Sequence, residues 1–210
     1  MSPFEFFFSF YGLLLGFSAA ELVGGFARLV HERRTVRIGA LTLLLGAFVA
    51  VDIATFWNQA WLIFRNAPFN LSLLVLGLFV ASTFYVAATS VFPREIKPGQ
   101  SLDEHFWVHR RLVLLCVLSA NWIMAISFFV LANFSGELAR LRLPPIFWGG
   151  LALFTTATLV AALAQRRRIV LTALIILVGY HAFTVGRSAV ALFQGDGWSM
   201  TRDRAPSSTR

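Results

Sequence analysis

The sequence predicts an all-α, polytopic integral membrane protein, a bundle of six transmembrane helices built from most of the 210 residues. Its composition is 58% hydrophobic and 13% charged, whereas a soluble domain is about half apolar and about a quarter charged. The apolar residues also lie in blocks of about 20 residues or more, the length that an α-helix needs to cross a hydrocarbon core about 30 Å thick. Together these two observations exclude an ordinary soluble domain.

Charged or proline-containing segments separate the predicted spans, as at His31–Arg34 and Pro144–Pro145. Ser101 and Glu104 have the spacing of a capping box, which predicts that a helix begins near Leu102. Residues 1–195 therefore form one transmembrane domain, and the polar residues 196–210 are expected to form a flexible tail. The expected spans are residues 4–30, 38–64, 69–92, 107–134, 146–164 and 169–193.

Basic residues are concentrated in the connections after the first, third and fifth spans. Because cytoplasmic loops carry an excess of Lys and Arg, this pattern predicts that both termini lie outside the cytoplasm in a multi-pass protein of the cell inner (plasma) membrane. The net charge of +8 is then explained by topology and lipid headgroups, and no nucleic-acid partner is expected.

Four ionisable residues lie within the predicted spans: Glu21, Asp52, His181 and Arg187. Each costs about 2.5–3.5 kcal/mol at a helix centre, so such residues usually face the protein interior and find a partner. At about 1.5 Å per residue, Asp52 lies roughly 21 Å and His181 roughly 18–20 Å from the cytoplasmic ends of their spans. Asn121, at roughly 16 Å, has a similar depth. We therefore expect Asp52 and His181 to be able to touch.

Two functions agree with these polar residues. In the leading hypothesis the protein is a small permease or channel, in which Glu21, Asp52 and His181 carry a proton or small cation and Arg187 tunes or neutralises them, since histidine titrates near neutral pH. In the alternative, the polar residues form a buried network that holds the helices in register. The protein is then a non-catalytic scaffold or accessory subunit of a larger membrane complex.

Small residues recur every fourth position in the first span, at Gly12, Gly16, Ala20 and Gly24. Such a groove lets another helix approach closely. The partner helix can belong to the same chain, to a second copy in a homo-oligomer, or to another membrane protein.

The odd-numbered spans also resemble one another without gaps, which suggests three helical hairpins derived from one. If real, this repeat would arrange the polar residues Asp52, Asn121 and His181 around a shared axis. Chance resemblance between apolar helices is the alternative. The aligned segments are residues 17–24, 79–86 and 154–161.

No motif for phosphate-loop, zinc-protease, dithiol or serine-hydrolase chemistry is present in the sequence. His105 and His109 stand at i, i+4, a spacing that can hold a metal ion, but with no third ligand in view a surface histidine pair is the favoured interpretation. The sequence therefore predicts no catalytic residue, no cofactor and no enzyme activity.

Overall fold

The computed structural model describes residues 3–34, 39–64, 70–95, 101–136 and 143–194. Within these ranges the chain forms six long helices, and their bounds agree with the predicted spans to within a few residues. The helices are α1 (Pro3–His31), α2 (Ala40–Phe64), α3 (Leu71–Val91), α4 (Leu102–Phe134), α5 (Pro145–Leu163) and α6 (Arg167–Gln194). The proposed flexible tail, residues 196–210, lies outside the described residues.

Every one of the six helices is long and apolar enough to cross a membrane. The shortest, α5, has 19 residues, which corresponds to about 28 Å. The prediction of a six-helix, multi-pass membrane protein is confirmed.

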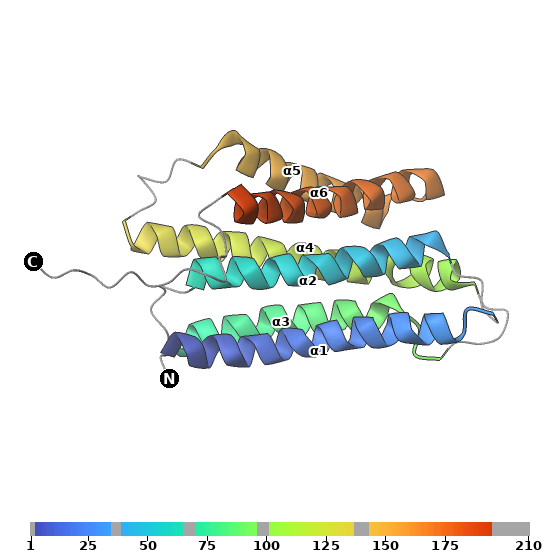
Figure 1. Ribbon diagram of the computed structural model, residues 1–210, viewed down its shortest axis with the longest axis horizontal. Helices are drawn as coiled ribbons and strands as arrows, with labels where there is room; N and C mark the ends of the chain where they lie inside the picture. The colour runs from blue at the N-terminus through green and yellow to red at the C-terminus, as the bar shows by residue number, and fades with distance from the viewer. Residues whose placement is uncertain (1–2, 35–38, 65–69, 96–100, 137–142, 195–210) are drawn as a thin grey trace, which may run out of the picture.

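The helices form three layers of two (Figure 1): α1 with α3, α2 with α4, and α5 with α6. The central helix is α2, which contacts α1, α3, α4 and α6. Half of the residues in its most apolar 18-residue segment are buried, a larger share than in any other described helix. A polar side chain on α2 is therefore the best placed to meet partners from several other helices.

The α1–α3 layer is held by a stripe of buried residues at heptad-like spacing along α1, the pattern of a close helix pair. A small residue is needed beside Phe92, the residue that follows α3, because a Cβ on Gly25 would strike its ring. On α3, Gly77 likewise faces Phe7. The buried stripe consists of Phe7, Tyr11, Leu15, Ser18, Leu22, Gly25 and Leu29.

The described helices pack in layers and do not form a threefold ring. Among the described helices, α5 contacts α4 and α6 but neither α1 nor α3. The even-numbered helices α4 and α6 meet α2 without contacting each other. Common descent of the hairpins stays a hypothesis, but their present arrangement is layered.

One local prediction is wrong. The fourth helix does begin at Leu102, but the side chain of Ser101 makes no capping hydrogen bond. Instead, the backbone N–H of Glu104 donates to the carbonyl oxygen of Ser101 at 3.2 Å. The first turn thereby satisfies this N–H through the backbone, and the side-chain cap is not needed.

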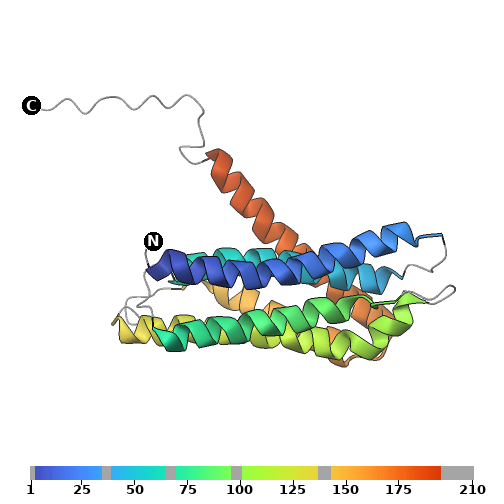
Figure 2. The same cartoon turned by 90° about the horizontal axis from the view of Figure 1, so that it is seen from below.

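The helix α6 lies obliquely to the others, and its C-terminal part leaves the bundle (Figure 2). Of residues 182–190, all but Thr184 are exposed.

Candidate functional site: a buried carboxylate–histidine pair in a one-sided cavity

The polar centre of the bundle is Asp52 on α2, whose side chain is 2% exposed. Its Oδ1 lies 3.0 Å from Nε2 of His181 on α6. Its Oδ2 accepts a hydrogen bond of 2.9 Å from Nδ2 of Asn121 on α4. The three even-numbered helices are thus tied together at one carboxylate, and the contact between Asp52 and His181 that their depths predict is present.

The second hydrogen bonds of the two partners determine how this cluster is protonated. Nδ2 of Asn121 also donates to the carbonyl oxygen of Val117 at 3.0 Å, so both of its protons are used and the amide orientation is defined. Nδ1 of His181 lies 3.0 Å from the carbonyl oxygen of Leu177. A carbonyl oxygen can only accept, so Nδ1 carries a proton.

One further proton must therefore lie between Nε2 of His181 and Oδ1 of Asp52. With it, the pair is either an imidazolium beside a carboxylate or a neutral imidazole beside a carboxylic acid. Both forms have zero net charge. Without it, two acceptors face each other at 3.0 Å, which is unfavourable in a buried site. The geometry thus defines a site for one exchangeable proton.

A cavity of about 420 Å³ adjoins this pair. Its polar lining comes from Asp52, Asn121, His181, Tyr180 and Gln59. Gln59 and the neighbouring lining residue Leu62 are exposed near the end of α2. The cavity therefore runs from the middle of the bundle toward the end where α2 and α4 finish, a distance of about 16 Å along α2. The rest of its lining is apolar: Leu62, Ile63, Met124, Ala125, Phe128, Phe147, Gly150, Leu151 and Phe154.

Toward the opposite end of the bundle the pair is sealed by apolar side chains. The ring of Phe48, which is 0% exposed, stacks edge-on to His181 with centroids 5.5 Å apart. Beyond Phe48, on the side away from the cavity, α2, α4 and α6 contribute residues that are at most 1% exposed, and none of these residues lines the cavity. These residues are Leu41, Leu45, Val113, Leu114, Val117, Val170, Leu174 and Leu177.

Two of the predicted site residues are not in this cluster. Glu21 lies in a different pocket, between α1 and α3. Arg187 is exposed on α6, with its guanidinium 5.9 Å from the ring centroid of Phe183. Six residues on a helix correspond to about 240° of rotation, so Arg187 leaves α6 on a different side from His181. Of the five predicted residues, the structure thus brings three together: Asp52, Asn121 and His181.

The histidine pair on α4 is stacked, with the rings of His105 and His109 4.1 Å apart at their centroids. Nε2 of His105 meets the carbonyl oxygen of Ser90 at 3.1 Å, and Nδ1 of His109 meets that of His105 at 3.1 Å. Among the described residues, no group of three or more potential ligands could hold a metal ion. Both side chains are half-buried, and whether the pair binds a metal ion stays a prediction.

The small-residue groove of α1 is only partly used inside the chain. A Cβ on Gly12 would approach the indole of Trp57 to 2.8 Å, whereas a Cβ on Gly16 would meet nothing within 4 Å. Ala20 is exposed, and Gly24 lies beside the guanidinium of Arg28. Between Gly12 and Gly16 the groove faces outward.

The sequence analysis did not single out Tyr11 or Tyr180. The hydroxyl of Tyr11 is buried with no hydrogen-bond partner among the described residues, and it lies within electrostatic range of Asp52. Tyr180 lines the cavity beside His181. Tyrosines within apolar spans are the signal that could have indicated them, because a tyrosine hydroxyl inside a bundle normally finds a hydrogen-bond partner.

No protein-family model matches this chain, and neither a curated protein nor a solved structure shows significant similarity to it. Its class therefore follows from fold and site alone. It is a polytopic α-helical membrane protein with a buried carboxylate–histidine pair at the closed end of a cavity.

Proposed function

We propose that the protein is a small permease for protons or small cations, and that the Asp52–His181 pair is its proton-binding site. The observation that carries this proposal is the proton shared between Oδ1 of Asp52 and Nε2 of His181, 3.0 Å apart, at the closed end of a cavity of about 420 Å³.

The pair suits proton binding in a membrane because it stays neutral when the site is occupied. Release of the proton leaves one net negative charge in a place of low dielectric, which is costly. A small cation that enters the cavity can offset this charge, with the carboxylate of Asp52 as a ligand of the kind that hard cations prefer. Proton release and cation entry are then coupled.

A carrier mechanism is favoured over an open channel because the cavity is sealed on one side. Within the described residues, the side chain of Phe48 and the buried apolar residues beyond it fill the bundle between the cavity and its other end. A second, oppositely open state is therefore required for transport. On the orientation predicted from the basic residues, the present cavity faces away from the cytoplasm.

The test is proton and cation flux in proteoliposomes, with a pH-sensitive dye inside the vesicles and an imposed pH or Na⁺ or K⁺ gradient. We expect flux above that of empty liposomes for the wild type, and flux close to that of empty liposomes for Asp52→Asn and His181→Gln. Glu104→Gln is the matched control, since it removes a carboxylate that is exposed on α4. It should transport like the wild type.

Two results would overturn the proposal. The first is an absence of flux above empty liposomes for wild-type protein that is folded, under each gradient. The second is undiminished flux through Asp52→Asn, because that variant cannot release a proton from this position.

The alternative function, a scaffold or accessory subunit, is favoured by one observation. The groove lined by Gly12, Gly16, Phe17 and Trp57 is open on the outside of α1, where a partner helix or a second copy can lie. Under this alternative, Gly16→Leu should abolish an assembly detected by native mass spectrometry of the solubilised membrane, whereas Gly179→Leu, at another glycine with no neighbour within 4 Å, should not.

A further inference from the structure

A second pocket, of about 240 Å³, lies between α1 and α3 near the end of the bundle opposite to the cavity mouth. Its floor is formed by Ala88 and Phe92, which are 2% and 3% exposed. The α1–α3 layer is an outer layer of the bundle (Figure 1). Because the buried floor faces the bundle core, the pocket faces outward, toward lipid.

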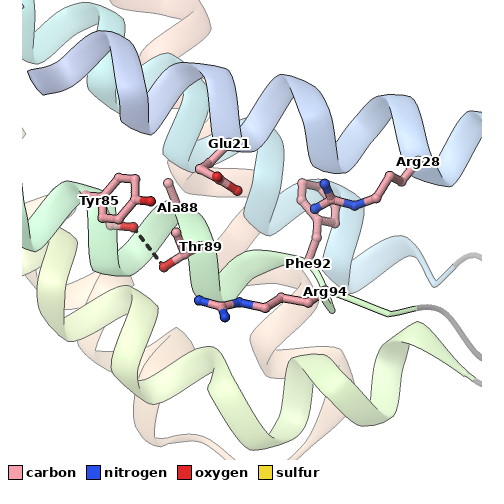
Figure 3. Close-up of a pocket in the computed structure, with 7 residues that line it drawn as sticks. All are labelled: Glu21, Arg28, Tyr85, Ala88, Thr89, Phe92 and Arg94. Carbon is pink, nitrogen blue, oxygen red and sulfur yellow. Dashed lines mark hydrogen bonds between the residues drawn. The ribbon is translucent and has the colours of Figure 1, made fainter. Parts of the chain in front are cut away.

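The charged side chains around this pocket converge on it from both helices (Figure 3). Arg28 folds back along α1, so that its Nη1 lies 3.7 Å from the Cβ position of Gly24. Arg94, just after α3, extends back toward Thr89, and Glu21 points in from the deeper side. The hydroxyl of Thr89 donates to the carbonyl oxygen of Tyr85 at 3.0 Å. Its oxygen can therefore still accept a hydrogen bond from another group.

The charges in the pocket do not balance. Within the described part of the chain, neither Arg28 nor Arg94 forms an ion pair at 4.0 Å or less. Among the side chains that line this pocket, two guanidinium groups and one carboxylate leave one net positive charge, in a place where the bilayer weakens the screening by water. A group with one negative charge would make the site neutral.

The depth of the pocket indicates which kind of ligand supplies this negative charge. Arg28 lies three residues before the end of α1 at His31, and Arg94 three residues after the end of α3 at Val91. Both guanidinium groups are therefore at the level of the lipid headgroups on that side of the membrane. Basic pockets between helices at this level bind lipid headgroups. A neighbouring pocket of about 360 Å³ shares Arg28 and Arg94 and is also lined by His31 and Glu32. It gives room for a headgroup beside the phosphate, and the carboxylate of Glu32 can accept hydrogen bonds from the glycerol hydroxyls of such a headgroup.

We infer that this pocket binds the phosphodiester of an anionic phospholipid, with Arg28 and Arg94 as the phosphate ligands. A phosphodiester has one negative charge and matches the site, whereas a dianionic free phosphate would leave it negative. The carboxylate of Glu21 is the reason that the pocket is matched by one negative charge and not by two. Phosphatidylcholine has the same diester, but its own ammonium group offsets the attraction to the two arginines.

The experiment is native mass spectrometry of the purified full chain in detergent, with phosphatidylglycerol or phosphatidylcholine added at equal concentration. We expect one phosphatidylglycerol to be retained preferentially. The double variant Arg28→Gln/Arg94→Gln should bind it about 30-fold more weakly, because each basic residue near the surface contributes about a factor of five. The matched control, Arg111→Gln/Arg166→Gln, removes two arginines exposed at the same end of the bundle and should keep wild-type affinity. Glu21→Gln should bind more tightly than the wild type.

Equal loss of binding in both double variants would overturn the inference, since it would indicate general attraction to a basic surface. Equal retention of the two lipids by the wild type would also overturn it. Inorganic phosphate is the third arm. If it binds the delipidated protein with the same dependence on Arg28 and Arg94, and excess phosphate displaces the lipid completely, the site belongs to a soluble phosphate and the lipid assignment is wrong.

Discussion

Asp52 and His181 lie 129 residues apart in the chain, yet their side chains meet at 3.0 Å in the buried centre of the bundle. The contact joins α2, the central helix, to α6, which leaves the bundle obliquely a few residues later (Figure 2). It is the point at which the most central and the most divergent helix are held together, and it borders the cavity directly.

Replacing Asp52 should affect stability in a way that depends on the replacement. In Asp52→Asn, the amide oxygen can accept from Asn121 and the amide nitrogen can donate to Nε2 of His181. We therefore expect a change of less than about 1 kcal/mol. Asp52→Ala leaves both partners without a hydrogen bond and should cost about 1–3 kcal/mol. Reversible unfolding in mixed micelles measures both. Equal destabilisation by the two variants would contradict the proposed hydrogen-bond pattern.

The tautomer of His181 can be observed directly. Since its Nδ1 donates to Leu177, we expect a protonated Nδ1 at all pH values at which the fold persists. In Asp52→Asn the ring should be the neutral tautomer with a bare Nε2. Solid-state ¹⁵N NMR of histidine-labelled protein in bilayers, with His181→Gln to assign the signal, distinguishes the forms. A neutral ring protonated on Nε2 alone would contradict the assignment.

The one-sided cavity predicts which positions react with water-soluble thiol reagents. The one cysteine of the sequence, Cys116, is first replaced by serine. In this background Ala125→Cys, at a position that lines the cavity, should react with a membrane-impermeant methanethiosulfonate. Leu45→Cys, at a side chain that is 1% exposed on the sealed side, should not. Mass spectrometry of intact cells and of inverted vesicles reads out both the reaction and its side. Labelling of Ala125→Cys from the cytoplasmic side would reverse the predicted orientation.

The glycines of α1 should differ in their tolerance of a methyl group. Gly25→Ala places a Cβ against the Phe92 ring and should destabilise the protein by about 1–3 kcal/mol through overpacking. Gly16→Ala adds the same group where nothing lies within 4 Å, and it should be neutral or slightly stabilising because alanine favours the helix. Thermal unfolding in detergent compares the two. A loss at Gly16 equal to that at Gly25 would indicate that another helix lies in the groove.

Much of the site could be anticipated from the sequence because helix depth is nearly a linear function of residue number. Asp52, Asn121 and His181 fall at similar depths, and the structure brings them together. The depth of a residue does not tell which neighbouring helix its side chain faces, because the sequence does not say which helices are neighbours. For that reason Glu21 and Arg187 were grouped with the pair, although Glu21 faces the pocket between α1 and α3 and Arg187 is exposed.

The sequence alone determined the six membrane-spanning helices and their ends, because hydrophobic length and the charged or proline-containing breaks are local properties. Only the tertiary structure decided the three-layer order, the oblique path of α6 and the end of the bundle toward which the cavity extends. These depend on which apolar faces meet. In helices that are apolar on every side, the pattern of residues does not determine which faces pack together. Close contacts, such as Gly25 with Phe92 and Asp52 with His181, determine it instead.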